Sequence, residues 1–266
     1  MKKNNHKNVD KLSNSSGITL VALIVAIVVL LILASITIAN ITGNDAPAEK
    51  AAQAKNETEI QAEMEELQEE NNSVPITDID NLTPTKLDKR LYLWQGDITR
   101  LNADAIVNAA NSQLLGCFIP CHGCIDNAIH SAAGLQLRYE CYNIMTTQRH
   151  EEPTGQAKIT RGYNLPAKHV IHTVGPIVSG AVTQRHREEL GSCYRSCLEI
   201  ADSEGLNSIA FCCISTGEFH FPNDEAVRIA VSIVKDFMTR AKNINHVIFN
   251  VFKNIDRDLY MKELAA

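Results

Sequence analysis

A long uninterrupted apolar run near the amino terminus divides this chain into two unequal parts. Residues 18–39 contain no charged side chain over 22 positions, and a helix of that length spans about 33 Å, enough to cross the hydrocarbon core of a bilayer. A cleaved secretory signal is the alternative, but such a signal has a shorter apolar region and a small-x-small cleavage site, neither of which is clear here. The pattern predicts a basic leader at residues 1–17 and one retained transmembrane helix at residues 18–39, hence a single-pass membrane protein.

The charges that flank this run predict its orientation. Four lysines precede it, whereas Asp45 and Glu49 follow it. Because positive charge is retained on the cytoplasmic side of a membrane, the rest of the chain would face outward. The eight cysteines of the chain instead favour a reducing compartment. The sequence therefore leaves open which side of the membrane holds the larger part.

Residues 40–84 are polar and are expected to separate the membrane segment from the rest. Residues 47–72 are rich in Ala, Glu, Gln and Lys, which favour helix, and their apolar side chains are too sparse for a core face. A narrow apolar stripe at spacings of four and three could pair weakly with another helix; it consists of Ile60, Met64 and Leu67. A solvated helical stalk is the simpler interpretation. Two prolines then mark residues 72–84 as a linker.

From residue 85 onward, short apolar runs alternate with longer amphipathic stretches. The runs are rich in β-branched or aromatic residues, as buried strands are, and lie at residues 90–94, 105–109, 169–174, 208–214 and 246–252. Apolar residues at helical spacing predict helices at residues 125–145, 187–203 and 224–241. Alternating strands and helices predict a three-layer α/β domain over residues 85–266. Its mixed central sheet would be covered on both faces, with ligands beyond the strand ends.

The composition limits the functions that fit. Without the leader, membrane segment and stalk, about 180 residues remain, which suits one domain with a well-formed core and leaves no room for a second catalytic domain. The formal net charge is −6. Affinity for a phosphate backbone comes largely from clustered Lys and Arg, so no nucleic-acid partner is expected.

Thiols and an imidazole gather in one turn-rich stretch. Cys117, His122 and Cys124 form a C-x4-H-x-C cluster, and two thiolates with one imidazole suit a zinc ion. Three protein ligands leave a fourth position for water or substrate, which is the pattern of catalytic rather than structural zinc. Cys121 could close the shell, although its neighbour His122 would then share the ion at awkward geometry. The alternative is that these cysteines are small buried hydrophobes and the histidine a satisfied core residue.

Several motifs, in the same order along the chain, resemble the macrodomain, an α/β module that binds ADP-ribose. They are Trp94-Gln-Gly-Asp-Ile-Thr99, Val107-Asn-Ala-Ala-Asn111, Pro153-Thr-Gly-Gln-Ala157, His172-Thr-Val-Gly-Pro176, Cys213-Ile-Ser-Thr-Gly-Glu-Phe219 and Asn250-Val-Phe252. The stretch Gly116-Cys-Phe-Ile-Pro-Cys-His-Gly-Cys124 is similar to the insertion of the zinc-dependent branch of that family, which hydrolyses ADP-ribose from modified proteins. The resemblance covers residues 86–266.

The resemblance implies a binding role for each matched residue. Asp97 would accept a hydrogen bond from the adenine amino group, Ile98 would supply backbone contacts, and Phe252 would cover the adenine face. Asn108 and Asn111 would bind the distal ribose. The loop after the predicted strand at 208–214 would cradle the diphosphate with its backbone N–H groups; it contains Ser215, Thr216, Gly217, Glu218 and Phe219. The simpler alternatives are a turn residue for Asp97 and core packing for Phe252.

The resemblance also implies a chemistry. Zinc on the three ligands would either lower the pKa of a water or orient the distal ribose. Asn111 and Asp126 are the expected catalytic residues, because Asp126 lies where related zinc-free hydrolases place a catalytic aspartate that can act as general base. Capping of the following helix is the other role open to Asp126. The expected activity is removal of mono-ADP-ribose from modified proteins, with ADP-ribose and the ADP-ribosylated protein as partners.

Two rival functions remain. One is a non-catalytic module that binds ADP-ribose. The other arises from Ser16-Gly-Ile-Thr-Leu20, which resembles the start of type IV pilin-like proteins, whose leader is cleaved after the glycine. Those proteins usually carry glutamate at the fifth mature position, where this chain has Ala22. The second rival is therefore a pilin-like surface subunit that carries the domain as cargo.

Overall fold

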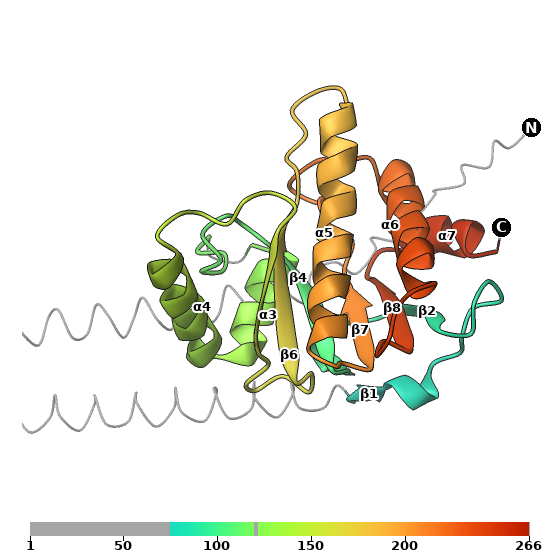
Figure 1. The fold of residues 1–266 in the computed structure, drawn as a ribbon, viewed down its shortest axis with the longest axis horizontal. Coiled ribbons are helices and arrows are strands. Elements are labelled where there is room, and N and C mark those ends of the chain that lie inside the picture. The colour runs from blue at the N-terminus through green and yellow to red at the C-terminus, as the bar shows by residue number, and fades with distance from the viewer. Residues whose placement is uncertain (1–74, 120–121, 266) are drawn as a thin grey trace, which may run out of the picture. The chain divides into compact units, whose positions relative to one another are not determined.

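The computed structural model describes residues 75–119 and 122–265 (Figure 1). The predicted leader, the transmembrane helix and the stalk up to residue 74 lie outside the described residues and stay predictions. Among the residues that are described, no helix has both the length and the apolar character needed to cross a membrane.

Six strands form the central sheet in the order β2–β8–β7–β4–β6–β5. They are β2 (Leu91–Gln95), β4 (Ala105–Ala110), β5 (Ala157–Arg161), β6 (His169–Val174), β7 (Ser208–Phe211) and β8 (His246–Val251). Every neighbouring pair is parallel except β5 and β6, which are antiparallel at one edge. The four inner strands are almost wholly buried, as strands covered on both faces must be. The predicted mixed sheet is confirmed.

The helices form a layer on each face of this sheet (Figure 1). They are α3 (Ile125–Ala133), α4 (Leu135–Gln148), α5 (Gln184–Ser203), α6 (Asn223–Met238) and α7 (Asn254–Glu263). In β6, His172 contacts Cys141 of α4, whereas the next residue, Thr173, contacts Cys193 of α5. Successive strand residues point to opposite faces, so α4 and α5 cover opposite faces. α3 packs beside α4, α6 packs on α5, and α7 packs on α6.

The single helix predicted at residues 125–145 is wrong, because the chain forms two helices there. Gly134 separates α3 from α4 with φ 89° and ψ 178°, a region that is essentially restricted to glycine. A Cβ at this position would come within 2.9 Å of the Asn164 side chain. Ile129 and Leu137, on either side of the break, are both fully buried. Apolar spacing therefore continues through the break and conceals it.

Two elements have no clear sequence signal. β5 carries Lys158 and Arg161 among its five residues, because an edge strand is only half covered. α7 is largely polar, and only Asp256 and Tyr260 within it are buried. Neither segment shows the continuous apolar run or the wide apolar stripe on which the other predictions rest.

The described end of the predicted linker is folded onto the domain. β1 (Thr77–Asp78) pairs in parallel with β3 (Leu101–Asn102), and Asn102 Nδ2 donates to Asp78 Oδ1 at 2.7 Å. A 3-10 turn, η1 (Ile79–Asn81), follows β1, and its Ile79 packs against the core. Residues 77–82 thus belong to the packed structure and do not form a free spacer.

Asp104, just before β4, joins three segments at the amino edge of the sheet. Its carboxylate accepts hydrogen bonds from Lys168 Nζ at 2.7 Å and from the backbone N–H groups of Asn207 and Ser208 at 2.9 and 3.0 Å. Burial alone would raise the pKa of Asp104, but these donors outweigh it and hold the pKa below its ordinary value. The ionised side chain therefore stabilises the folded state.

We expect Asp104→Asn to lower the free energy of unfolding near neutral pH by about 1–3 kcal/mol, because an amide turns a donor toward the N–H groups of the adjoining strand. The depressed pKa means that the contribution of the carboxylate is complete above about pH 4, the ordinary value, and is lost as the pH falls through the folded-state pKa. Urea unfolding at several pH values should show that the difference in free energy of unfolding between wild type and variant becomes smaller as the pH falls. Asp258→Asn, an exposed control, should change little at any pH. A gap that is constant with pH would contradict the assignment.

Candidate functional site

The carboxyl ends of the parallel strands gather the predicted site residues at one edge of the sheet. β4 leads into the loop at residues 111–124, β7 leads into residues 212–222, and β2 and β8 lead to Asp97 and Phe252. Parallel strands all end at the same edge, so segments far apart in sequence meet there. The predicted site residues therefore lie beyond the carboxyl ends of the strands.

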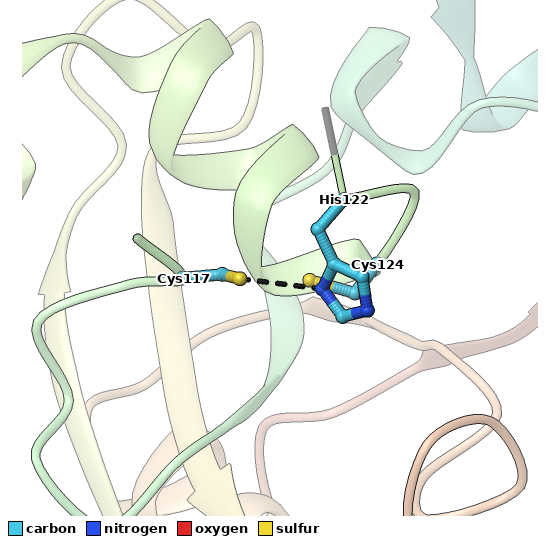
Figure 2. A group of neighbouring side chains, drawn as sticks. All are labelled: Cys117, His122 and Cys124. Carbon is cyan, nitrogen blue, oxygen red and sulfur yellow. Dashed lines mark hydrogen bonds between the residues drawn. The ribbon is translucent and has the colours of Figure 1, made fainter. Parts of the chain in front are cut away.

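The three predicted metal ligands converge in the loop between β4 and α3 (Figure 2). Cys117 Sγ lies 3.2 Å from His122 Nδ1, and one ligand atom from each of Cys117, His122 and Cys124 lies within 4.8 Å of the other two. All three side chains are half-buried. Zinc–sulfur and zinc–nitrogen bonds measure about 2.3 and 2.0–2.1 Å, so donors this close can reach one ion. Cys121 lies outside the described residues.

Local hydrogen bonds hold both ends of this loop. At its start, Asn111 Nδ2 donates to the Gly116 carbonyl at 3.2 Å. At its end, Asn127 Nδ2 donates to the His122 carbonyl at 2.9 Å, and Cys124 is the N-cap of α3, its Sγ accepting from the Asn127 N–H at 3.4 Å. The amino-terminal turn of α3 therefore holds the Cys124 side chain and the backbone of His122.

Burial raises the pKa of the Cys124 thiol to about 11, so without a cation the thiol is neutral. A bound divalent ion reverses this preference and favours the thiolate. On the far side of the imidazole ring, His122 Nε2 faces Glu218 Oε1 at 3.5 Å.

Asp126, in the first turn of α3, is held by amides on both carboxylate oxygens. Asn108 Nδ2 donates to Oδ1 at 2.7 Å, and Asn111 Nδ2 to Oδ2 at 3.4 Å. The residue is 5% exposed, and burial raises its pKa against the opposing effect of the Asn108 hydrogen bond. The cap of α3 is Cys124, so capping is not the role of Asp126.

Asn108 lies beneath Asp126 and away from the open surface. Its side chain is fully buried, and Nδ2 also lies 3.1 Å from His172 Nδ1. We expected Asn108 to bind the distal ribose directly. The structure instead gives it contacts that position Asp126, while Asn111 is the half-buried amide of the pair.

A second cluster of potential metal donors lies under Asp126 and consists of His130, Cys141 and His172. Sequence reasoning did not single out either histidine, although His130 follows Asp126 by one helical turn. His172 Nε2 pairs with Thr160 Oγ1 at 3.0 Å, so both of its ring nitrogens have partners. Burial lowers the pKa of His130 to about 4 and of His172 to about 3, so both are neutral near pH 7. His172 thus belongs to a neutral hydrogen-bonded network with Asn108 and Thr160, whereas neither ring nitrogen of the buried His130 has a hydrogen-bond partner among the described residues, and its Nε2 lies 3.6 Å from Asp126 Oδ1.

The loop after β7 forms a backbone cradle. Ser215 has φ 64°, and Phe221 N–H donates to its carbonyl at 2.9 Å, which closes the loop. Within the part of the chain that the structure describes, the N–H groups of Gly217, Glu218 and Phe219 donate no hydrogen bond. The buried Ser215 Oγ also has no partner there. Unpaired donors beside the start of α6 suit an anion. The hydroxyl of the half-buried Thr216 donates a hydrogen bond to the Cys213 carbonyl at 3.1 Å.

Asp97 and Phe252 lie just beyond the carboxyl ends of the neighbouring strands β2 and β8, in which Gln95 pairs with Val251. Asp97 Oδ1 accepts from Thr99 N–H at 2.9 Å as the cap of the short helix η2 (Ile98–Arg100), which matches the turn role. Phe252 is 67% exposed, which excludes core packing for its ring, whereas the Ile98 side chain is buried.

The fold and the site together define an α/β ligand-binding domain with a candidate metal centre at the carboxyl edge of its sheet. The sequence profile of the Macro domain matches residues 107–230. A protein-ADP-ribose hydrolase of Treponema medium is 55% identical over 174 residues, 65% of this chain and 67% of that protein. A protein-ADP-ribose hydrolase of Staphylococcus aureus (strain MRSA252) is 52% identical over 186 residues, 70% of each chain.

Solved structures agree with this relationship. A mutant Oceanobacillus iheyensis macrodomain with ADP-ribose is 37% identical, with a TM-score of 0.61 over 66% of this chain and 91% of that one. A Trypanosoma brucei macrodomain in complex with ADP-ribose is 36% identical, with a TM-score of 0.61 over 71% of this chain and 76% of that one. The chain belongs to the macro domain family, as its motifs predicted.

The conformation of the loop at residues 111–124, which carries the candidate metal ligands, depends on Gly116. Its φ is 81°, and a Cβ there would lie 2.8 Å from Cγ of the buried His130 ring. We expect Gly116→Ala to lower the free energy of unfolding by more than about 1 kcal/mol, because both the backbone and the ring must shift. Gly123→Ala, in the same loop, meets no atom within 4 Å and should be close to neutral. Urea unfolding of both variants tests this, and equal losses would contradict it.

Proposed function

We propose that this protein is a zinc-dependent hydrolase that removes mono-ADP-ribose from modified proteins. The observation that carries the proposal is the half-buried trio of Cys117, His122 and Cys124, because its member Cys124 is the N-cap of α3 and Asp126 lies in the first turn of the same helix. One soft metal donor and a buried, oriented carboxylate thus share one helix terminus. The two protein-ADP-ribose hydrolases that are more than 50% identical to this chain support the hydrolase activity.

The binding residues suit the successive parts of ADP-ribose along the edge of the sheet. Asp97 and the exposed Phe252 ring provide the adenine end. The free N–H groups at residues 217–219 receive the diphosphate. Asn111, between the metal loop and Asp126, contacts the distal ribose. The similar macrodomains of Oceanobacillus iheyensis and Trypanosoma brucei were solved with ADP-ribose, which supports the choice of this ligand.

The chain's own residues then supply the hydrolytic step. Asp126 accepts a proton from a water that attacks the distal ribose C1″, and the bond from C1″ to the carboxyl oxygen of the modified protein breaks. The products are free ADP-ribose and the restored carboxylate. Asn108 and Asn111 keep the Asp126 oxygens oriented through the hydrogen bonds described above. Cys117, His122 and Cys124 would hold a zinc ion, which when bound would supply positive charge to orient the ribose hydroxyls or to acidify a water.

Metal removal should abolish the reaction. We expect the purified full chain to hold about one zinc and to release ADP-ribose from a protein modified on acidic residues, since three donors make one site with an open position. A chelator should stop release, and added zinc should restore it. Replacing Cys117 and Cys124 together by serine should remove the zinc and the activity, whereas Cys213→Ser, at a half-buried cysteine outside the trio, should keep both.

The opposite result would support the rival function, a non-catalytic module that binds ADP-ribose. If the wild-type chain binds ADP-ribose tightly and releases none from several linkage types, the protein is a binding module and the trio a structural clasp.

The role of Asp126 has its own test. Asp126→Asn should lower kcat by about 10²–10⁴-fold, because the amide cannot accept the proton, while the zinc content stays that of the wild type. Asp224→Asn is the matched control, since Asp224 is also acidic and in the first turn of a helix, α6, but is exposed. A kcat within a few-fold of the wild-type value for Asp126→Asn would show that Asp126 is not the general base.

A further inference from the structure

The proposed diphosphate loop, residues 212–222 after β7, contacts the proposed metal loop, residues 111–124 after β4, through one side chain. Glu218 lies at the tip of the loop after β7, and its Oε1 is 3.5 Å from Nε2 of His122, in the loop after β4. β4 and β7 are neighbours in the sheet, which brings these sequence-distant loops together. The opposite ring nitrogen, Nδ1, faces Cys117 Sγ at 3.2 Å. The imidazole is therefore held between a thiol and a carboxylate.

His122 is the ligand whose orientation most needs support. Cys124 is fixed by the Asn127 N–H, and Asn127 also binds the His122 carbonyl, but that contact leaves the imidazole free to rotate. A histidine that binds a metal through one nitrogen commonly donates its other N–H to a carboxylate, which fixes the tautomer and the ring plane. Glu218 is placed to accept that proton.

We propose that Glu218 is a positioning residue for the metal ligand His122, and that it couples the diphosphate loop to the metal centre. The proposal rests on the proposed function, because it requires an ion on the trio. It assigns Glu218 a role different from the substrate contact that the sequence motif implies. With Nε2–H directed at Glu218, the Nδ1 lone pair points toward the thiols.

The geometry of the contact makes it sensitive to what fills the loop. The Glu218 side chain is 69% exposed, and 3.5 Å is longer than a strong hydrogen bond. Diphosphate bound to the N–H groups of residues 217–219 orders the backbone that carries this carboxylate. Binding of the nucleotide therefore strengthens the metal site, and by linkage the metal strengthens nucleotide binding by the same factor.

The test measures zinc affinity instead of activity. The full chain, kept in mild detergent because of residues 18–39, is titrated with zinc against a chromophoric chelator, with and without saturating ADP. ADP fills the adenine and diphosphate positions but lacks the distal ribose, so it cannot reach the metal directly. Coupling between ADP and zinc then passes through the protein. Glu204→Ala is the matched control, because Glu204 is exposed at the end of α5 at the opposite edge of the sheet.

We expect Glu218→Ala to weaken zinc binding about 10–100-fold. Glu218→Gln should lose less, because its amide oxygen still accepts the Nε2–H but carries no charge. ADP should tighten zinc binding about five-fold or more in the wild type and in Glu204→Ala. In Glu218→Ala it should have almost no effect.

Two outcomes would overturn the proposal, and they differ. Unchanged zinc affinity in Glu218→Ala, with weaker ADP binding, would make Glu218 a nucleotide-binding residue and leave the proposed hydrolase intact. A wild-type chain that binds no zinc would remove the metal site and with it both proposals. Equal thermal unfolding of the zinc-free forms verifies that the variants fold.

Discussion

The hydrogen bond from Asn108 Nδ2 to Asp126 Oδ1, at 2.7 Å, is the interaction on which the site depends. It joins the central strand β4 to the first turn of α3, and the metal loop must span the distance between these two fixed points. Both groups are buried, so loss of either partner would leave an unsatisfied polar atom at a cost of about 1–3 kcal/mol. The same Asn108 amide also meets His172, which continues the network to Thr160 in the edge strand β5. The catalytic edge is thus anchored across the sheet.

Apolar patterning located the inner strands because their environment is uniform, although the run predicted at residues 208–214 extends three residues beyond the observed end of β7 at Phe211. β4, β6 and β8 are covered on both faces and carry continuous apolar runs, so their positions follow from the sequence within a residue. β5 and the break at Gly134 could not be predicted from the spacing of apolar residues, because two other constraints determine them. One is an exposed sheet edge, and the other is a backbone conformation open to glycine alone.

The trio of Cys117, His122 and Cys124 could be proposed from the sequence because its members lie within eight residues and their chemistry is local. The contacts between loops could not. The strand order places β7 beside β4 and β8 beside β2, and this order brings Glu218 to His122 and Phe252 to the side of Asp97. Asn108 and Asn111 show the same limit within a single motif, since one amide is fully buried and its neighbour three residues on is half-buried.

The start of α3 resolves an electrostatic problem that the site would otherwise have. Two thiolates and the Asp126 carboxylate would repel one another, and burial already disfavours charge on Cys124 and on Asp126. The helix terminus supplies about half a positive charge, and Cys124 Sγ accepts one of its free N–H groups. The proposed divalent ion would offset most of the remaining negative charge. The underlying histidines stay neutral and add no competing charge. A divalent ion bound by the trio would therefore offset negative charge that the helix terminus alone cannot, at the point where Cys124 caps α3 and Asp126 lies in its first turn.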